Sequence, residues 1–143
     1  MSDSQNFLDR YSKELIKTVL VQTLSDFKIE WLYLFGSAAQ KTDTLHSDLD
    51  FAFYAHSDYA PYDIFVKAQE IAQQFHKEVD LVPLRTATTV FQKEVLSSGV
   101  VIWDSAPIQR QEFEGIVLKK YARLNEERAL ILKDQYGVIV DGG

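Results

Sequence analysis

Residues 31–50 read WLYLFGSAAQKTDTLHSDLD, and this stretch decides the fold. It opens on the apolar run WLYLF, which predicts a buried strand, and Gly36 ends that run at a tight turn. A small, polar connection follows, beginning with one expected helical turn. Apolar residues then alternate with others over 49–54, the period of a strand with one buried face. The stretch therefore predicts two strands joined by a glycine turn and a polar loop, with Asp48 and Asp50 where the second strand begins.

Outside this stretch, helical and strand patterns alternate along the chain. We expect helices over 5–25, over 61–75 with Pro61 in the first turn, from a cap at Thr86 to Gly99, and from Pro107 to about 135; further strands are expected over 79–84 and 100–103. The tail YGVIVDGG is irregular or strand-like in pattern. No repeat, low-complexity tract or Pro/Gly/Ser linker divides the chain, so residues 1–143 are predicted to form one domain.

Composition narrows the classes of function. The 143 residues include no cysteine, which excludes disulfides, thiolate nucleophiles and cysteine-bound zinc. The formal net charge of -6 disfavours direct nucleic-acid binding, because that affinity rests largely on Lys and Arg replacing counterions. No apolar run approaches the roughly 20 residues that span a bilayer, and the N-terminus lacks a signal-peptide layout. We therefore expect a cytoplasmic protein that does not act at a membrane.

Three aspartates form the pattern that carries chemistry. Asp48 and Asp50 are two residues apart, so their carboxylates share one face of the expected strand, and Asp80 interrupts an apolar strand further along. Like charges this close cost free energy unless a proton or cation is shared, and carboxylate oxygens suit Mg²⁺. The alternative to a metal site is an ordinary acidic strand entrance that is exposed to water. The trio favours a metal site with two Mg²⁺ ions for phosphoryl transfer. Asp43, by contrast, is expected to be a solvated loop residue.

The glycine turn supplies the other half of the predicted site. Gly36 allows backbone N–H groups to approach a phosphate closely, and Ser37 can both cap the following helical turn and donate its hydroxyl to a phosphate. Ser47 either contacts a phosphate or shapes the turn before the aspartates, and the sequence leaves both readings open. Lys41 is the one lysine or arginine between residues 36 and 48. These residues are the predicted nucleotide-binding set.

The spacing of these residues resembles a known signature. Gly36-Ser37, ten intervening residues, then Asp48-Leu49-Asp50 resembles the nucleotidyltransferase motif, and Asp80 falls where that superfamily carries its third metal-binding carboxylate. In a chain this short, the pattern is similar to that of minimal nucleotidyltransferase (MNT) antitoxins, which act beside HEPN-domain ribonuclease toxins. The resemblance spans roughly residues 10–105 and implies an α/β (α+β), polymerase-beta-like fold: a small mixed sheet flanked by helices, here followed by a long C-terminal helix.

The resemblance also implies an activity. Members of this family use ATP and Mg²⁺ to transfer AMP to a tyrosine of the partner toxin, which neutralises it. This chain departs from the family in the phosphate loop, where an arginine often follows Gly-Ser and a glycine comes a little later, because residues 38–41 read AAQK. Two alternatives remain open from the residues alone: a transferase acting on a small hydroxylated molecule such as an aminoglycoside, and a non-catalytic antitoxin that acts by binding.

Overall fold

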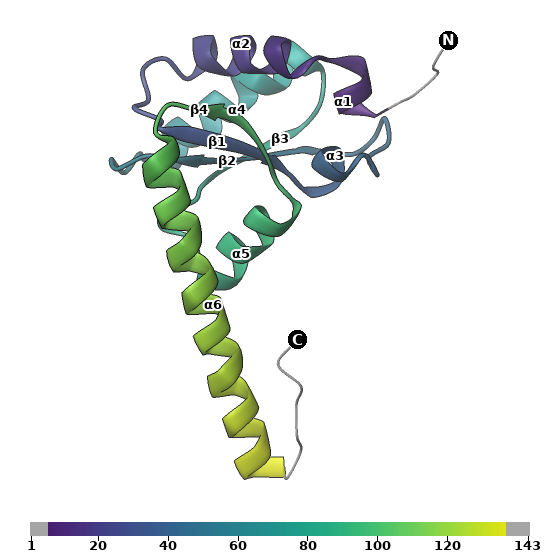
Figure 1. The fold of residues 1–143 in the computed structure, drawn as a ribbon. Helices are drawn as coiled ribbons and strands as arrows, with labels where there is room; N and C mark the ends of the chain where they lie inside the picture. The colour runs from purple at the N-terminus through teal and green to yellow at the C-terminus, as the bar shows by residue number, and fades with distance from the viewer. Residues whose placement is uncertain (1–5, 137–143) are drawn as a thin grey trace.

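The computed structural model describes residues 6–136, which form a four-stranded mixed sheet with helices on both faces (Figure 1). The sheet order is β3-β2-β1-β4. The strands are β1 (Trp31–Phe35), β2 (Leu49–Tyr54), β3 (Val79–Pro83) and β4 (Val100–Asp104). β1 pairs antiparallel with both β2 and β4, whereas β2 pairs parallel with β3. This sheet confirms the expected fold class, and each strand lies within one residue of its predicted bounds.

Six helices complete the described part of the chain. They are α1 (Phe7–Arg10), α2 (Lys13–Thr23), α3 (Gly36–Gln40), α4 (Pro61–Phe75), α5 (Thr89–Ser98) and α6 (Pro107–Tyr136). The single helix expected over 5–25 is wrong: Tyr11 is extended, and the Ser12 side chain accepts the Leu15 N–H to start a new helix. The cap expected at Thr86 is also wrong, because Thr88 accepts the Phe91 N–H instead. The tail beyond Tyr136 lies outside the described residues.

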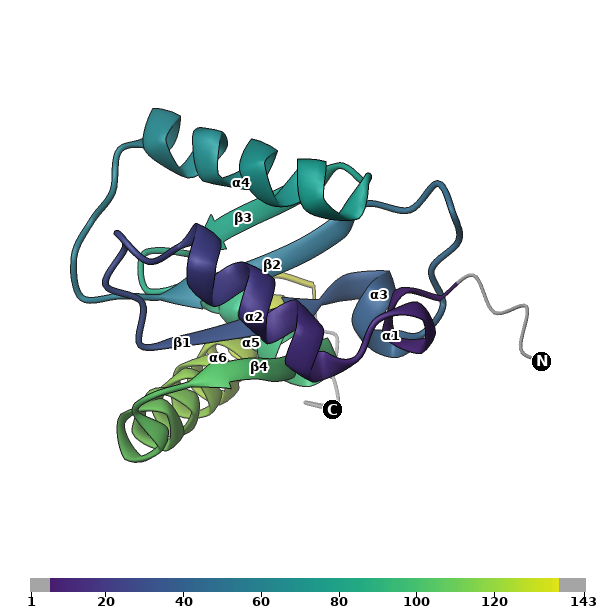
Figure 2. The ribbon, with the colours of Figure 1, turned by 90° about the horizontal axis from the view of Figure 1, so that it is seen from above.

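The two faces of the sheet carry different helices. α2 and α4 cover one face, α5 and the start of α6 cover the other, and α4 runs alongside β3 (Figures 1 and 2). The α2/α4 face holds the larger core, into which β2 sends Phe51 and Phe53. Each of these fully buried rings contributes roughly 2–3 kcal/mol through burial. Because a shift by one residue would exchange the two faces of β2, this burial fixes Asp50 on the α5 side.

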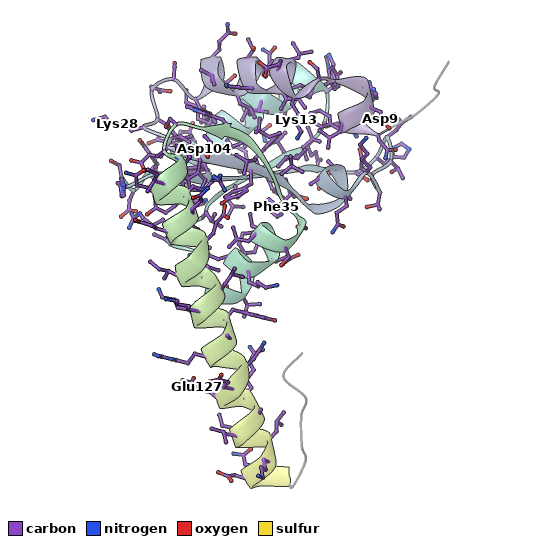
Figure 3. All side chains as sticks on the ribbon, viewed as in Figure 1. Asp9, Lys13, Lys28, Phe35, Asp104 and Glu127 are labelled. Atoms are coloured by element: carbon purple, nitrogen blue, oxygen red, sulfur yellow. The ribbon has the colours of Figure 1, made fainter. Side chains whose placement is uncertain are left out.

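α6 extends well beyond the body of the protein. Its 30 residues give a length of about 45 Å, and its first half packs through Phe113 and the buried Val117. The outer half stands clear of the sheet, as the position of Glu127 shows (Figure 3). Exposed apolar side chains there include Leu130 and Ile131. Within residues 6–136, no helix combines the length and apolarity needed to cross a membrane.

Candidate active site

The parallel pairing of β2 and β3 brings two of the predicted carboxylates together. Asp50 and Asp80 are direct partners in the register, on strands that lie about 4.8 Å apart. Paired residues on adjacent strands point to the same face, so both carboxylates lie on the α5 side of the sheet. Asp48 directly precedes β2, two residues before Asp50. Asp50 is half-buried, whereas Asp48 and Asp80 are exposed.

The charges of the neighbouring carboxylates contribute to the pKa of Asp50. Burial, as the largest cause, and the negative charges of Asp80 and Asp48 together raise the pKa of Asp50 from an ordinary 3.8 to about 6. A hydrogen bond with Asp80 and the charge of Glu94 on α5 act in the same direction. The site is therefore a cluster of carboxylates in which Asp50 keeps its proton up to about pH 6.

The donor set fits Mg²⁺. Among residues 6–136, no three or more His, Cys, Asp or Glu side chains form a ready-made metal cage. Mg²⁺ does not require one, since it commonly binds through one or two carboxylates and completes its shell with substrate phosphates and waters. Burial and the neighbouring carboxylates both raise the pKa of Asp50, so its negative charge is disfavoured there, and a bound cation would stabilise that charge. Asp48, Asp50 and Asp80 are the side chains that could hold such an ion.

Gly36 lies directly against Asp50. Its φ of +73° is in the left-handed region, and a Cβ placed there would lie 2.5 Å from Asp50 Oδ2. Phe35, the preceding residue, is the register partner of Asp50, which explains the close approach. Glycine is therefore required twice, once by the backbone conformation and once by the carboxylate. The glycine turn and the aspartates predicted from sequence meet at one point.

The remaining predicted nucleotide-binding residues differ in what they contact. Ser37 lies in the first turn of α3, whose leading N–H groups have no partner within the helix, and its side chain is half-buried. Ser47 Oγ accepts the Thr44 N–H at 2.9 Å, so this hydroxyl shapes the turn. Lys41 ends α3 with a left-handed backbone, and its Nζ lies 2.9 Å from Asp9 Oδ1 on α1. Contacts of all three with phosphate stay predictions.

The expectation that Asp43 is solvated is wrong. Its side chain is 5% exposed, and Oδ2 accepts the Phe7 N–H at 2.9 Å. Asp43 thereby caps the start of α1 from a distance of 36 residues in sequence. Its polar neighbours in sequence gave no sign of burial, because the partner of its carboxylate comes from α1. Asp43 therefore links the loop between α3 and β2 to the start of α1.

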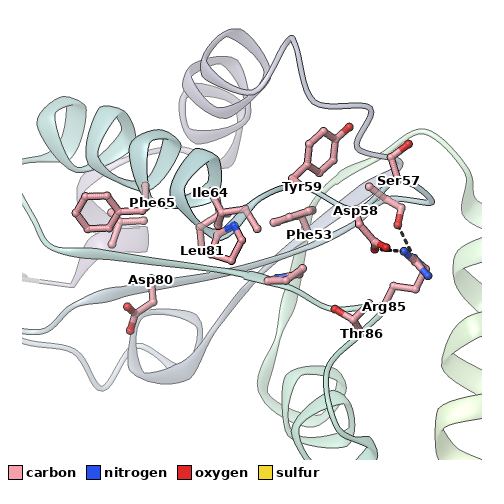
Figure 4. Close-up of a pocket in the computed structure, with 15 residues that line it drawn as sticks. Phe53, Ser57, Asp58, Tyr59, Ile64, Phe65, Asp80, Leu81, Arg85 and Thr86 are labelled. Carbon is pink, nitrogen blue, oxygen red and sulfur yellow. Dashed lines mark hydrogen bonds and ion pairs between the residues drawn. The ribbon is translucent and has the colours of Figure 1, made fainter.

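A cavity of about 550 Å³ lies between α4 and β3. Its walls are mainly apolar, with Ile64, Phe65 and Leu81 among them, and Asp80 borders it at one end (Figure 4). The Asp80 side chain points to the opposite side of β3 from Ile64 and Phe65 (Figure 4). An ion pair between Arg85 and Asp58 lies among its walls. This cavity is thus next to the carboxylate cluster but on the other face of the sheet.

The fold and the carboxylate cluster agree with a family comparison. The family model for polymerase beta nucleotidyltransferases matches residues 14–108, which include Gly36, Ser37 and all three aspartates. The chain belongs to this family. This nucleotidyltransferase is 31% identical over 125 residues to the protein adenylyltransferase MntA of Shewanella oneidensis. The match covers 85% of this chain and 88% of MntA.

The solved structures that resemble this nucleotidyltransferase include chains of toxin–antitoxin complexes. A chain in the crystal structure of a toxin–antitoxin with AMP-PNP shares 31% identity at a TM-score of 0.74, covering 82% of this chain and 96% of that one. A second likeness is to the structure of a tri-AMPylated Shewanella oneidensis HEPN toxin in complex with its MNT antitoxin. There the identity is 28% and the TM-score 0.70, covering 85% of this chain and 97% of that one.

Sequence reasoning missed one carboxylate of this nucleotidyltransferase. Glu94 lies on an exposed position of α5, yet its charge raises the pKa of Asp50. Nothing in the α5 sequence distinguishes Glu94 from an ordinary surface residue. Only the packing of α5 under the sheet brings it near the site.

Proposed function

We propose that this nucleotidyltransferase transfers AMP from ATP to a tyrosine hydroxyl of a partner HEPN-type toxin in the cytoplasm, and so neutralises the toxin. The observation that carries the proposal is the direct pairing of Asp50 with Asp80 beside Gly36. That geometry occurs in a chain 31% identical to a protein adenylyltransferase, and a related MNT antitoxin is seen in complex with an AMPylated HEPN toxin. We also propose that residues 1–143 form a single nucleotidyltransferase domain.

The three aspartates form the metal-binding part of the proposed mechanism. Asp48, Asp50 and Asp80 would hold Mg²⁺, two ions in the fullest arrangement, together with the oxygens of the triphosphate. Bound Mg²⁺ supplies neutralising charge for the phosphates and the pyrophosphate leaving group. Asp50 has the most restricted position, since it is half-buried against Gly36 and paired with β3. It fixes the site, while the exposed Asp48 and Asp80 adjust to the substrate.

The acceptor reaction moves one proton. The tyrosine oxygen forms a bond to the α-phosphorus, the bond from that phosphorus to the bridging oxygen breaks, and pyrophosphate leaves. A tyrosine hydroxyl with an ordinary pKa near 10 must lose its proton as it attacks. Asp80 is the carboxylate best placed to accept it, because it is exposed and lies on the edge strand β3, where an acceptor can approach.

The phosphate loop supplies binding contacts. Gly36 leaves room for phosphate oxygens beside Asp50, and the first N–H groups of α3 and the Ser37 hydroxyl donate to them. Lys41 is proposed to neutralise the leaving pyrophosphate. Reaching it would cost the exposed ion pair with Asp9, which is worth about 0–1 kcal/mol. Ser47 assists through the turn that it shapes, or by direct contact with phosphate.

A protein acceptor fits the surface better than a small polycation does. The cavity next to Asp80 lies on the opposite face of the sheet from the carboxylates, so it does not provide a pocket beside them for an aminoglycoside. The exposed apolar residues of the outer half of α6 instead suit contact with a partner protein. A purely binding role is disfavoured, because it has no need of a carboxylate cluster that raises the pKa of Asp50.

Co-expression with a candidate HEPN toxin tests the proposal. Mass spectrometry of the toxin should show added AMP with the wild-type protein and none with the Asp48→Ala/Asp50→Ala double variant. Growth of cells that express the toxin should recover with the wild-type protein but not with the double variant. An unmodified toxin that is fully silenced by the double variant would replace the enzymatic proposal with neutralisation by binding.

A further inference from the structure

Lys77, in the turn between α4 and β3, has a side chain committed to another part of the chain. Its Nζ lies 3.1 Å from each of three backbone carbonyl oxygens, those of Thr44, Leu45 and Ser47. An ammonium group has three N–H donors, so the three carbonyls can take all of them. The ammonium therefore acts as a local cross-link between the turn and the loop formed by residues 44–47, called here the 44–47 loop.

The 44–47 loop is shaped to receive this ammonium. The Ser47 N–H donates to the Thr44 carbonyl at 3.2 Å, and the Thr44 N–H donates to Ser47 Oγ at 2.9 Å. This reciprocal pair closes a tight turn whose carbonyl oxygens converge on Lys77 Nζ. Without the ammonium, these carbonyl oxygens would lose their charged donor, and a hydrogen bond to a charged group is stronger than one between neutral groups.

Both ends of this cross-link lead to the aspartates. The Ser47 carbonyl immediately precedes Asp48, and Lys77 lies three residues before Asp80. The backbone of Lys77 is itself fixed, since its N–H donates to the Ala72 carbonyl at the end of α4. Lys77 therefore joins the segment that carries Asp48 to the segment that carries Asp80.

We propose that Lys77 is a positioning residue for nucleotidyl transfer, whose ammonium group holds the 44–47 loop so that Asp48 faces Asp50 and Asp80. The inference rests on the proposed function for its catalytic consequence. Lys77 acts through the loop and not on phosphate, because its three donors are directed at backbone carbonyls. Among the ion pairs within residues 6–136, none includes Lys77, so it does not neutralise the aspartates directly.

Replacing Lys77 with methionine tests the proposal, because methionine keeps an unbranched side chain and removes all three donors. Lys67→Met is the matched control: Lys67 is also a partly buried lysine but lies on α4, and its ion pairs are with Asp26 and Glu70. Lys77→Arg keeps the charge and donors. For each protein we would measure kcat and KM for ATP, the Mg²⁺ concentration giving half the maximal rate, the melting temperature, and backbone hydrogen exchange over residues 43–50.

Lys77→Met should lower kcat by about 10- to 100-fold, as loss of an orienting contact at a metal site does, and should raise the Mg²⁺ requirement. KM for ATP should change much less. Hydrogen exchange should increase over residues 43–50 in Lys77→Met but stay at the wild-type level there in Lys67→Met. Lys77→Arg should recover part of kcat. This pattern distinguishes positioning from a general loss of stability, which would affect both methionine variants alike.

Wild-type kcat and wild-type exchange in Lys77→Met would overturn the proposal. So would a fall in kcat that Lys67→Met reproduces at an equal loss of melting temperature. If the wild-type protein transfers no AMP, the proposed function fails instead. The exchange measurement, and calorimetric Mg²⁺ binding in the presence of AMP-PNP, would then still decide whether Lys77 holds the loop and the metal-binding residues.

Discussion

Replacing Gly36 with alanine should inactivate the enzyme more than it unfolds it. The backbone of Gly36 has a φ of +73°, and holding an L-residue there costs about 1–2 kcal/mol. The new Cβ would also lie 2.5 Å from Asp50 Oδ2, closer than real Cβ atoms approach other atoms. The carboxylate must move by several tenths of an ångström or change its side-chain torsion, which costs roughly another 0.5–1.5 kcal/mol. The total loss of folding free energy is about 1.5–3.5 kcal/mol.

A catalytic loss should add to this loss of stability, because the group that moves is Asp50 itself. Misplacing a catalytic group by about 1 Å can lower the rate on the order of 100-fold. Because Asp50 is displaced by several tenths of an ångström, we expect kcat per folded molecule to fall by up to that factor in Gly36→Ala. Initial rates of AMP transfer would be measured at saturating ATP, with the folded fraction determined by circular dichroism in the same buffer.

Two other glycines provide controls. A Cβ at Gly99 would lie 2.4 Å from the Val95 carbonyl oxygen, so Gly99→Ala should also destabilise the fold, but it leaves Asp50 undisturbed. A Cβ at Gly115 on α6 meets nothing within 4 Å, and alanine there should add about 0.5–1 kcal/mol of helix stability. If Gly36→Ala retains the wild-type rate per folded molecule, or if Gly99→Ala loses as much, the contact between Gly36 and Asp50 does not control catalysis.

Two further predictions concern single charges. Asp50→Asn should stabilise the Mg²⁺-free protein above pH 6 by about 1–2 kcal/mol. Because the pKa of Asp50 is raised, the folded protein keeps a proton that the unfolded chain has lost, and the contribution of Asp50 to stability falls as pH rises from 3.8 through about 6. Two pKa units represent roughly 3 kcal/mol, and solvent screening reduces this figure. Urea unfolding in EDTA at pH 4 and pH 7.5 would check this, and a less stable variant at pH 7.5 would contradict it. Lys41→Ala should raise KM for ATP about tenfold, because it removes one charge-assisted hydrogen bond of about 1.5 kcal/mol. The melting temperature should stay nearly unchanged, because the folded protein loses only an exposed ion pair with Asp9. Steady-state kinetics and a thermal melt would measure both, and an unchanged KM would limit Lys41 to its contact with α1.

The sequence predicted the strands and the glycine turn well because their signals are local. Period-2 alternation placed β2 within its true bounds, and the spacing of Gly36 from Asp48 identified the family. The parallel register that pairs Asp50 with Asp80 is not local, since it depends on how α4 carries the chain back to the sheet. The motif implied that these carboxylates converge, but only the structure gives their pairing.

Errors occurred where distant segments decide the environment. Asp43 has mostly polar neighbours in sequence, yet its side chain is buried, and α1 supplies the Phe7 N–H as its partner. Lys77 gave no signal either, because its three acceptors are backbone carbonyls, which look the same at every residue. The break between α1 and α2 was missed because apolar residues continue at helical spacing through Tyr11, although Ser12 starts a new helix.

The parallel pairing of β2 with β3 has a kinetic consequence for how the activity appears. Strands that pair in parallel are joined by a long crossover, here α4, and such non-local contacts form late and slowly during folding. Asp80 meets Asp50 only when that crossover has closed. A chain that has formed only the antiparallel β1–β2 hairpin already carries Asp48 and Asp50, but it lacks the third carboxylate. Recovery of AMP transfer after dilution from denaturant should therefore follow completion of the sheet rather than the earlier gain of helix.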